Sequence, residues 1–215
     1  MRLFLLVGCA CLAMAQDRVA LENDSVRIIN VIEQPHQKTP LHQHDFNRVI
    51  VYLDSGEMRT TYEDGRSEVT RYKAEQVTWS LAGGKHITEN IGAKPIHIIE
   101  IELKKPAPQT PPHLDPAMDP VHTDAKHNIV LFENDQVRVF RNWREPGASE
   151  TMHSHIGAGR VAVFLTGVHA SIKSADGSID ELNAPAGEAR WSGPATHMAT
   201  NIGPRRFDMI IVEVK

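Results

Sequence analysis

The chain alternates between short apolar runs and clusters of turn-forming residues. In the first half, runs rich in valine and isoleucine lie at residues 26–32, 48–53, 69–72 and 96–103. Turn clusters separate them at Asp54-Ser55-Gly56, Glu63-Asp64-Gly65 and Ala82-Gly83-Gly84. The second half has similar runs at residues 137–140, 160–165, 170–173 and 207–214. No long segment repeats its apolar residues with a period of about 3.6, so we expect an all-β protein with a sandwich or small barrel in each half.

The two halves match each other residue by residue. The segment 21–28, Leu-Glu-Asn-Asp-Ser-Val-Arg-Ile, resembles the segment 132–139, Phe-Glu-Asn-Asp-Gln-Val-Arg-Val. The offset of 111 residues that separates them also separates His42 from His153 and Asn90 from Asn201. A register shared over most of each half indicates an internal duplication.

A proline-rich segment lies between the halves, at residues 105–127. Six prolines fall within it, at Pro106, Pro108, Pro111, Pro112, Pro116 and Pro120. Repeated prolines remove backbone donors and favour extended chain. We therefore predict two domains, at residues 16–104 and 128–215, joined by a linker in which any helix is a short turn.

The first fifteen residues have the features of a secretory signal peptide. Arg2 precedes an apolar run at residues 3–12, and Ala13-Met14-Ala15 is a small-x-small cleavage site. The run is too short to span a bilayer. We expect an exported protein, periplasmic or extracellular. The alternatives are a hydrophobic N-terminus on a cytosolic protein and a lipoprotein signal around Cys9.

The composition limits the kinds of binding partner and of metal ligand that we expect. The chain has 215 residues, is 41% hydrophobic and carries a net charge of −4, so no broad basic surface invites nucleic acid or anionic lipid. We expect a small-molecule ligand or substrate, no nucleic acid and no membrane span. Both cysteines, Cys9 and Cys11, lie in the signal segment. Any metal in the mature chain must therefore be held by histidine, carboxylate or water.

Six of the twelve histidines form two matched sets. In each set two histidines stand one residue apart and a third follows some forty residues later: His42, His44 and His86 in the first half, and His153, His155 and His197 in the second. Alternate residues of a strand point to one face, so each set can present three nitrogen ligands and leave open positions on a metal. The alternative is three barrel histidines bonded to one another or to water.

These motifs resemble those of the cupin family, whose first motif is Gly-x5-His-x-His-x3-4-Glu-x6-Gly and whose second ends in Gly-x2-His-x3-Asn. The second half matches the first motif at Gly147, His153, His155, Arg160 and Gly167, and the first half at His36, His42, His44, Arg48 and Gly56. The second motif falls on Gly83, His86 and Asn90, and on Pro194, His197 and Asn201. The resemblance implies two tandem cupin domains, each a small β-barrel or jelly roll, and thus a bicupin. It also implies a divalent transition metal, with iron first and manganese, zinc or nickel as further candidates.

One position departs from the family motif in both halves. Arg48 and Arg160 stand where the family has its glutamate ligand, and an arginine cannot bind a metal. Three-histidine cupins occur among thiol dioxygenases and diketone-cleaving dioxygenases, so a metal is still expected. Three roles remain open for the arginines: binding a substrate anion beside the metal, pairing with an acid such as Asp45, Glu100 or Glu213, or pointing into solvent.

The sequence supports two hypotheses for function. The first is an exported bicupin metalloprotein that acts on a small anionic substrate as a dioxygenase-type or isomerase-type enzyme, with Arg48 and Arg160 binding the substrate. The second is a non-catalytic cupin that binds an anion or sugar acid, or has a structural role. No catalytic residue is assigned in either. We also expect the two domains to pack together as an intramolecular pseudo-dimer.

Overall fold

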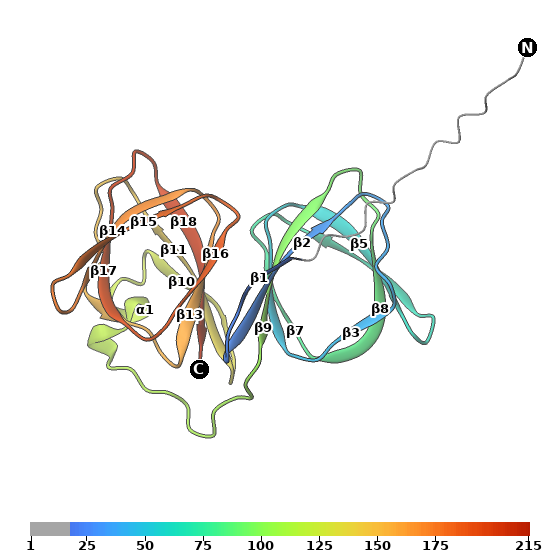
Figure 1. Ribbon diagram of the computed structural model, residues 1–215, viewed down its shortest axis with the longest axis horizontal. Helices are drawn as coiled ribbons and strands as arrows, with labels where there is room; N and C mark the ends of the chain where they lie inside the picture. The colour runs from blue at the N-terminus through green and yellow to red at the C-terminus, as the bar shows by residue number, and fades with distance from the viewer. Residues whose placement is uncertain (1–17) are drawn as a thin grey trace, which may run out of the picture.

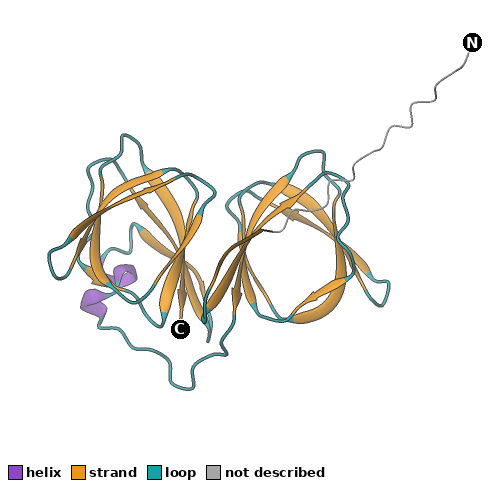
Figure 2. Cartoon of the chain, viewed as in Figure 1, coloured by secondary structure: helices purple, strands orange, loops and turns teal. Residues whose placement is uncertain are grey.

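The computed structural model describes residues 18–215, and the predicted signal segment lies outside the described residues. The described chain is built almost wholly of strands, arranged as two barrels side by side (Figures 1 and 2). Each barrel comes from one half of the chain. The prediction of an all-β protein with a small barrel in each half is therefore confirmed.

The N-terminal barrel contains nine strands in two antiparallel sheets. They are β1 (Arg18–Glu22), β2 (Val26–Glu33), β3 (His42–His44), β4 (Arg48–Tyr52), β5 (Gly56–Tyr62), β6 (Ser67–Tyr72), β7 (Val77–Ser80), β8 (Gly83–Asn90) and β9 (Ile96–Leu103). One sheet has the order β1-β2-β9-β4-β7 and the other β3-β8-β5-β6. The two sheets face each other and form a barrel (Figure 1), and the pairing of β2 with β9 joins the two ends of this half of the chain within one sheet.

The C-terminal barrel repeats this arrangement strand for strand. Its strands are β10 (Asn128–Glu133), β11 (Val137–Arg144), β12 (His153–Ser154), β13 (Gly159–Phe164), β14 (Val168–Ser174), β15 (Ile179–Ala184), β16 (Ala189–Ser192), β17 (Thr196–Asn201) and β18 (Phe207–Val214). The sheet orders are β10-β11-β18-β13-β16 and β12-β17-β14-β15. The duplication seen in the sequence is thus preserved in the topology.

The strands β9 and β18 lie at the centre of the two five-stranded sheets. Both were predicted with the bounds that the structure has, because each is a long run of apolar residues interrupted by only two or three polar ones. Every residue of β18 is buried. A strand reads as a continuous apolar run when both of its faces are covered. Here one face lines a barrel and the other faces the neighbouring barrel.

One hydrophobic core is shared by the two barrels. Buried residues from both halves belong to it: Val26, Ile28, Val49, Val51, Ile99, Ile101 and Leu103 from the first, and Val137, Val139, Val161, Val163, Ile210, Val212 and Val214 from the second. Arg141 of the second barrel also pairs with Glu75 of the first at 2.8 Å. The two five-stranded sheets therefore pack face to face through β-branched side chains.

The linker contains two helical elements, and both are short, as was expected of any helix in this segment. A 3-10 helix spans Pro116–Met118 (η1) and an α-helix spans Pro120–Thr123 (α1). The carboxylates of Asp115 and Asp119 cap them by accepting backbone N–H hydrogen bonds. No helix among residues 18–215 is long and apolar enough to cross a bilayer.

Two details of the chain path depart from, or explain, the sequence patterns. Gly83 and Gly84 were expected in a turn, but they open β8, both with positive φ. The correction follows from glycine's tolerance of left-handed conformations within an irregular strand end. His36 stands at the position of Gly147, and both have positive φ, of 60° and 76°. Their backbone N–H groups donate to the carbonyls of Asn90 and Asn201 respectively.

Candidate metal centres

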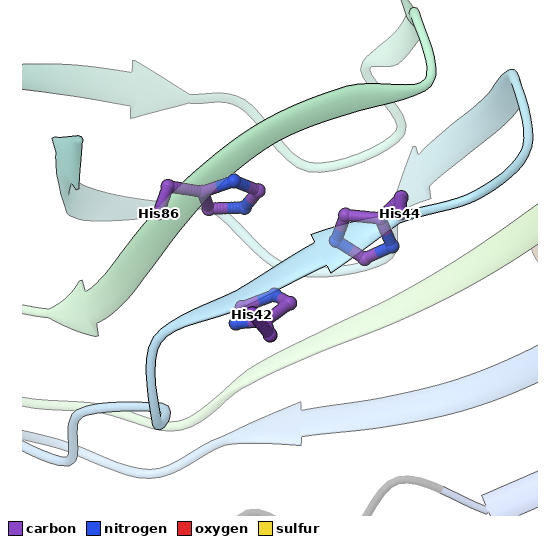
Figure 3. A group of neighbouring side chains, drawn as sticks. All are labelled: His42, His44 and His86. Carbon is purple, nitrogen blue, oxygen red and sulfur yellow. The ribbon is translucent and has the colours of Figure 1, made fainter. Parts of the chain in front are cut away.

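The first histidine set comes together at the edge of the N-terminal barrel. His42 and His44 lie on β3, and His86 lies on the neighbouring strand β8 directly opposite His42. Figure 3 shows the three rings gathered between these two strands. One ring nitrogen from each residue lies within 4.8 Å of the others. Such a cluster is the size of a single metal ion's ligand set.

The second set has almost the same geometry. His153 on β12 pairs with His197 on β17, and His155 follows just after β12. Its ring centroids are 4.9, 4.6 and 5.3 Å apart, against 5.0, 4.6 and 5.4 Å for the first set in the same order. The structure therefore brings together all six histidines that the sequence selected, in two equivalent groups.

Backbone carbonyls fix the orientation of three of the six rings. In each case Nδ1 faces the carbonyl two residues earlier: His42 with Pro40 at 2.9 Å, His86 with Gly84 at 2.6 Å and His153 with Thr151 at 2.9 Å. A carbonyl can only accept, so Nδ1 carries the proton and donates it. The lone pair is then on Nε2, which is the form that ligates a metal.

In the second set a carboxylate orients His155. Its Nδ1 lies 2.7 Å from Glu213 Oε1, and the other oxygen of Glu213 accepts from Arg138 Nε at 2.6 Å. Arg138 in turn donates to both oxygens of Asp119, at 2.7 and 3.0 Å. The Nε2 atom of His155 is buried and has no hydrogen-bond partner among the described residues. A nitrogen aimed into the group without a partner fits a metal ligand.

The first set has the matching residues in a looser arrangement. Glu102 accepts from Arg27 Nε at 2.6 Å, but its other oxygen is 3.7 Å from His44 Nδ1. The side chain of Arg27 is 34% exposed, whereas that of Arg138 is 6% exposed. Asp119 of the linker accepts two hydrogen bonds from Arg138. Among the described residues, no linker residue makes an equivalent contact with Arg27.

The sequence analysis missed these supporting pairs. Glu102 was not considered at all, and Glu213 was considered only as a partner for Arg160. The signal was present, because Arg27 matches Arg138 and Glu102 matches Glu213 at the same 111-residue offset. An arginine and a glutamate that recur at equivalent positions of largely apolar strands indicate a conserved pairing, and this signal was not used in the prediction.

Both arginines at the glutamate position point inward. Arg48 is only 6% exposed, and its Nε and Nη1 atoms have no hydrogen-bond partner among the described residues. Its Nη1 is 3.8 Å from Glu100 Oε2, which is an ion pair without a hydrogen bond. The Nη2 atom of Arg160 is 3.4 Å from His197 Nε2. The solvent-facing role is therefore excluded for both side chains.

Burial and the arginine charge favour the neutral form of three of the six histidines. Burial lowers the pKa of His86, and it lowers the pKa of His155 well below its ordinary value. Burial, followed by the charge of Arg160, lowers the pKa of His197 to about 3. Burial also raises the pKa of Glu213 to about 7, although a nearby guanidinium opposes the shift. Neutral imidazole is the form a metal needs.

The two barrels enclose very different cavities. The cavity beside the first histidine set has a volume of about 620 Å³, and the one beside the second about 110 Å³. Arg48 and the first set line the larger cavity, and Arg160 and the second set line the smaller one. Only the larger falls in the range of roughly 300–1,000 Å³ typical of small-molecule sites.

Solved structures that resemble the chain include a cupin barrel protein. AerE from Microcystis aeruginosa aligns with a TM-score of 0.63 and 13% identity over 94% of this chain and 98% of that one. A cupin 2 conserved barrel domain protein from Leptotrichia buccalis gives 0.57 and 12% over 94% and 90%. A variant of Bacillus subtilis oxalate decarboxylase gives 0.61 and 12% over 93% and 74%.

The protein has the cupin fold twice over, which makes it a bicupin by architecture. The resemblance to the cupin family that the motifs implied is thus confirmed at the level of the fold. No protein-family model matches the sequence, and no curated protein does.

Proposed function

We propose that the protein is an exported metal-binding bicupin whose N-terminal barrel binds a small anionic substrate. The observation that carries this proposal is the cavity of about 620 Å³, which contains both a three-histidine group and the buried guanidinium of Arg48. Arg48 Nη1 forms an ion pair with Glu100 at 3.8 Å, but the Nε and Nη1 donors have no hydrogen-bond acceptor among the described residues, and buried donors without an acceptor are costly. A carboxylate accepts from a guanidinium in a bidentate manner, so it is the simplest partner.

The metal we propose is a divalent transition metal in each histidine set. Imidazole ligands suit iron, manganese, zinc and nickel, and iron remains our first expectation. Manganese gains support from the Mn(II) centres named for Bacillus subtilis oxalate decarboxylase, which shares this fold. A bound metal with open positions supplies a Lewis acid or an oxygen-binding centre. His42, His44 and His86 would hold it in the first barrel, and His153, His155 and His197 in the second.

The two barrels divide the work in this proposal. In the N-terminal barrel Arg48 orients the substrate anion beside the metal, and the cavity wall holds the rest of the molecule. In the C-terminal barrel the small cavity leaves room for a metal and little else, so Arg160 acts on the electrostatics of the histidines. Dioxygenase-type and isomerase-type chemistry both fit the first barrel.

Export and internal pairing complete the proposal. The apolar run and small-x-small site at residues 3–15 support export to the periplasm or beyond. The shared apolar core supports a pseudo-two-fold pairing of the barrels within one chain.

A second candidate function is ligand binding without catalysis. The observation that favours it is the pair of N–H groups on Arg48 that have no hydrogen-bond partner among the described residues, which bind an anion whether or not a reaction follows. In this case the N-terminal barrel binds a small anion, and the metal has a structural role.

Metal analysis of purified protein tests the proposal directly. After reconstitution with Fe(II) or Mn(II) we expect about two ions per chain, and about one in each of the variants His86→Ala and His197→Ala. A chain that folds and binds no transition metal under these conditions would refute both metal centres.

A further inference from the structure

The wall of the N-terminal cavity is lined with threonine hydroxyls. They are Thr60 on β5, Thr70 on β6, Thr78 on β7 and Thr88 on β8. Strand register gives their counterparts in the C-terminal barrel: Ile172, Leu182, Arg190 and Ala199. Three of the four counterparts are apolar. The second barrel shows that apolar side chains can fill these positions, so filling the interior does not by itself require a hydroxyl group.

Two of these hydroxyls are available to a ligand. Thr60 and Thr70 line the cavity, and neither makes a side-chain hydrogen bond within the described chain. Thr88 is already bonded, to Thr39 at 3.2 Å and to Glu33 at 3.2 Å. A cavity hydroxyl without a protein partner bonds to water or to a ligand with polar groups of its own.

Arg48 defines one end of the cavity and Tyr52 the other. Both lie on β4 and line the cavity, four residues apart, which corresponds to about 13 Å along a strand. The ring of Tyr52 stacks on Tyr72 with centroids 3.8 Å apart. A two-carbon or three-carbon acid at Arg48 would leave the threonine wall without a partner.

We infer that the N-terminal barrel recognises a polyhydroxylated carboxylic acid of the sugar-acid class. Its carboxylate binds the unpaired N–H groups of Arg48 beside the histidine set, and its hydroxyls bond to Thr60 and Thr70. This inference rests on the proposed function, since it names the substrate class of the same site. It goes further because it requires hydroxyl groups along the ligand as well as charge.

Calorimetric titration of the Mn(II)-loaded full chain tests the inference. The ligands are D-gluconate, D-glucuronate and galactarate, with hexanoate and adipate as six-carbon acids without hydroxyls. We expect at least one sugar acid to bind about tenfold or more tightly than its unhydroxylated counterpart, since two hydrogen bonds of about 1 kcal/mol each are gained. This comparison needs no variant and is therefore independent of folding defects.

Matched variants test which side chains bind the hydroxyl groups of the sugar acid. Thr60→Val and Thr70→Val keep the side-chain shape, and each should weaken sugar-acid binding about fivefold while hexanoate binding stays constant. Ile172→Val, at the position equivalent to Thr60, is the control and should change neither.

The outcomes separate this inference from the proposed function. Equal binding of both kinds of acid, lost in Arg48→Met, would overturn the sugar-acid class and leave the anion site intact. Failure of every acid to bind a metal-loaded chain would overturn the inference and the substrate site together. Failure to load metal would refute the proposed metal centres.

Discussion

The two barrels have nearly the same backbone arrangement, but the cavities inside them differ greatly in volume. Their strand orders match, and the ring spacings of their histidine sets agree within 0.1 Å. Their cavities nevertheless measure about 620 and 110 Å³. Positions that close the sheet or orient a histidine have been kept, whereas positions that only fill the interior have diverged. The comparison indicates that the same barrel and histidine arrangement encloses a ligand-sized cavity in the first barrel and a much smaller cavity in the second.

Bulky apolar side chains fill the second barrel. Phe140 stands where the first barrel has Ile29, Phe207 stands where it has Ile96, and both belong to one buried cluster with Phe164. Val121 of the linker packs against the same cluster. The second barrel therefore supports its histidines with a well-filled interior, whereas the first encloses a cavity lined with polar and charged side chains.

Removing the buried carboxylate of the second barrel should have the largest effect on stability. Glu213→Ala removes the acceptor of Arg138 Nε and of His155 Nδ1 in a site with 0% exposure at Glu213, although Arg138 keeps its two hydrogen bonds to Asp119. We expect a loss of about 3 kcal/mol or more in the free energy of unfolding, because two buried donors are left unsatisfied at about 1–3 kcal/mol each. Denaturant titration measures it.

The matched variant Glu102→Ala should cost clearly less. Its arginine, Arg27, is partly exposed and can be solvated, and its contact with His44 is 3.7 Å. Equal losses for the two variants would show that the second barrel is no more tightly braced than the first.

Larger apolar side chains in the first cavity should reduce its volume and its anion affinity, so that it resembles the second cavity. The double variant Thr60→Ile with Thr70→Leu introduces the side chains of Ile172 and Leu182 at their equivalent positions. We expect anion affinity to fall by about tenfold or more, since volume and hydroxyls are both lost, while the metal content stays unchanged. Unaltered anion binding would mean that the ligand does not enter the barrel.

The linker aspartate should influence only the second metal centre. Asp119→Asn removes the charge that holds Arg138, and through it Glu213 and His155. Changes of this kind cost about 10–100-fold in metal affinity, and we expect the lower end. Competition with a chelator, performed on His86→Ala chains that retain only the second centre, measures the change.

A matched control lies four residues earlier in the linker. Asp115 also caps a short helix but makes no contact with Arg138, so Asp115→Asn should leave metal affinity unaltered. If both variants weakened the metal equally, the effect would come from linker folding and not from the arginine.

The smallest effect is expected at a pair of matched surface ion pairs. Lys104 bonds Glu22 at 2.7 Å, and Lys215 bonds Glu133 at 2.6 Å. Exposed pairs contribute about 0–1 kcal/mol, so Lys104→Ala should change the free energy of unfolding by less than about 1 kcal/mol. A larger loss would indicate that the barrel edge near β1 depends on this contact.

The sequence was informative where periodicity or duplication constrained it. The strands β9 and β18 were predicted with their observed bounds, and the six histidines were assigned to two sets that the structure does assemble. Asn90 and Asn201 end the second motif in each half, and each amide bonds three backbone groups in the same pattern. These features depend on spacing along the chain and on the internal repeat.

Properties that depend on three-dimensional packing were not predictable. The contrast between the cavities accompanies pairs such as Thr60 with Ile172 and Thr70 with Leu182, whose effect on the free volume depends on how their neighbours pack. The link from Asp119 to His155 joins residues far apart along the chain through two intermediates. Whether Arg48 points inward could not be decided until the side chains around it were placed.

The central claim is that the first barrel binds the ligand at its metal and the second does not. The most direct test is the Mn(II) electron paramagnetic resonance spectrum of two single-centre chains, His197→Ala and His86→Ala, with and without the acid that binds best. We predict that the ligand alters the spectrum of the His197→Ala chain, which retains the first centre, and leaves that of the His86→Ala chain unchanged. A ligand-induced change confined to the His86→Ala chain, or of equal size in both, would contradict the account.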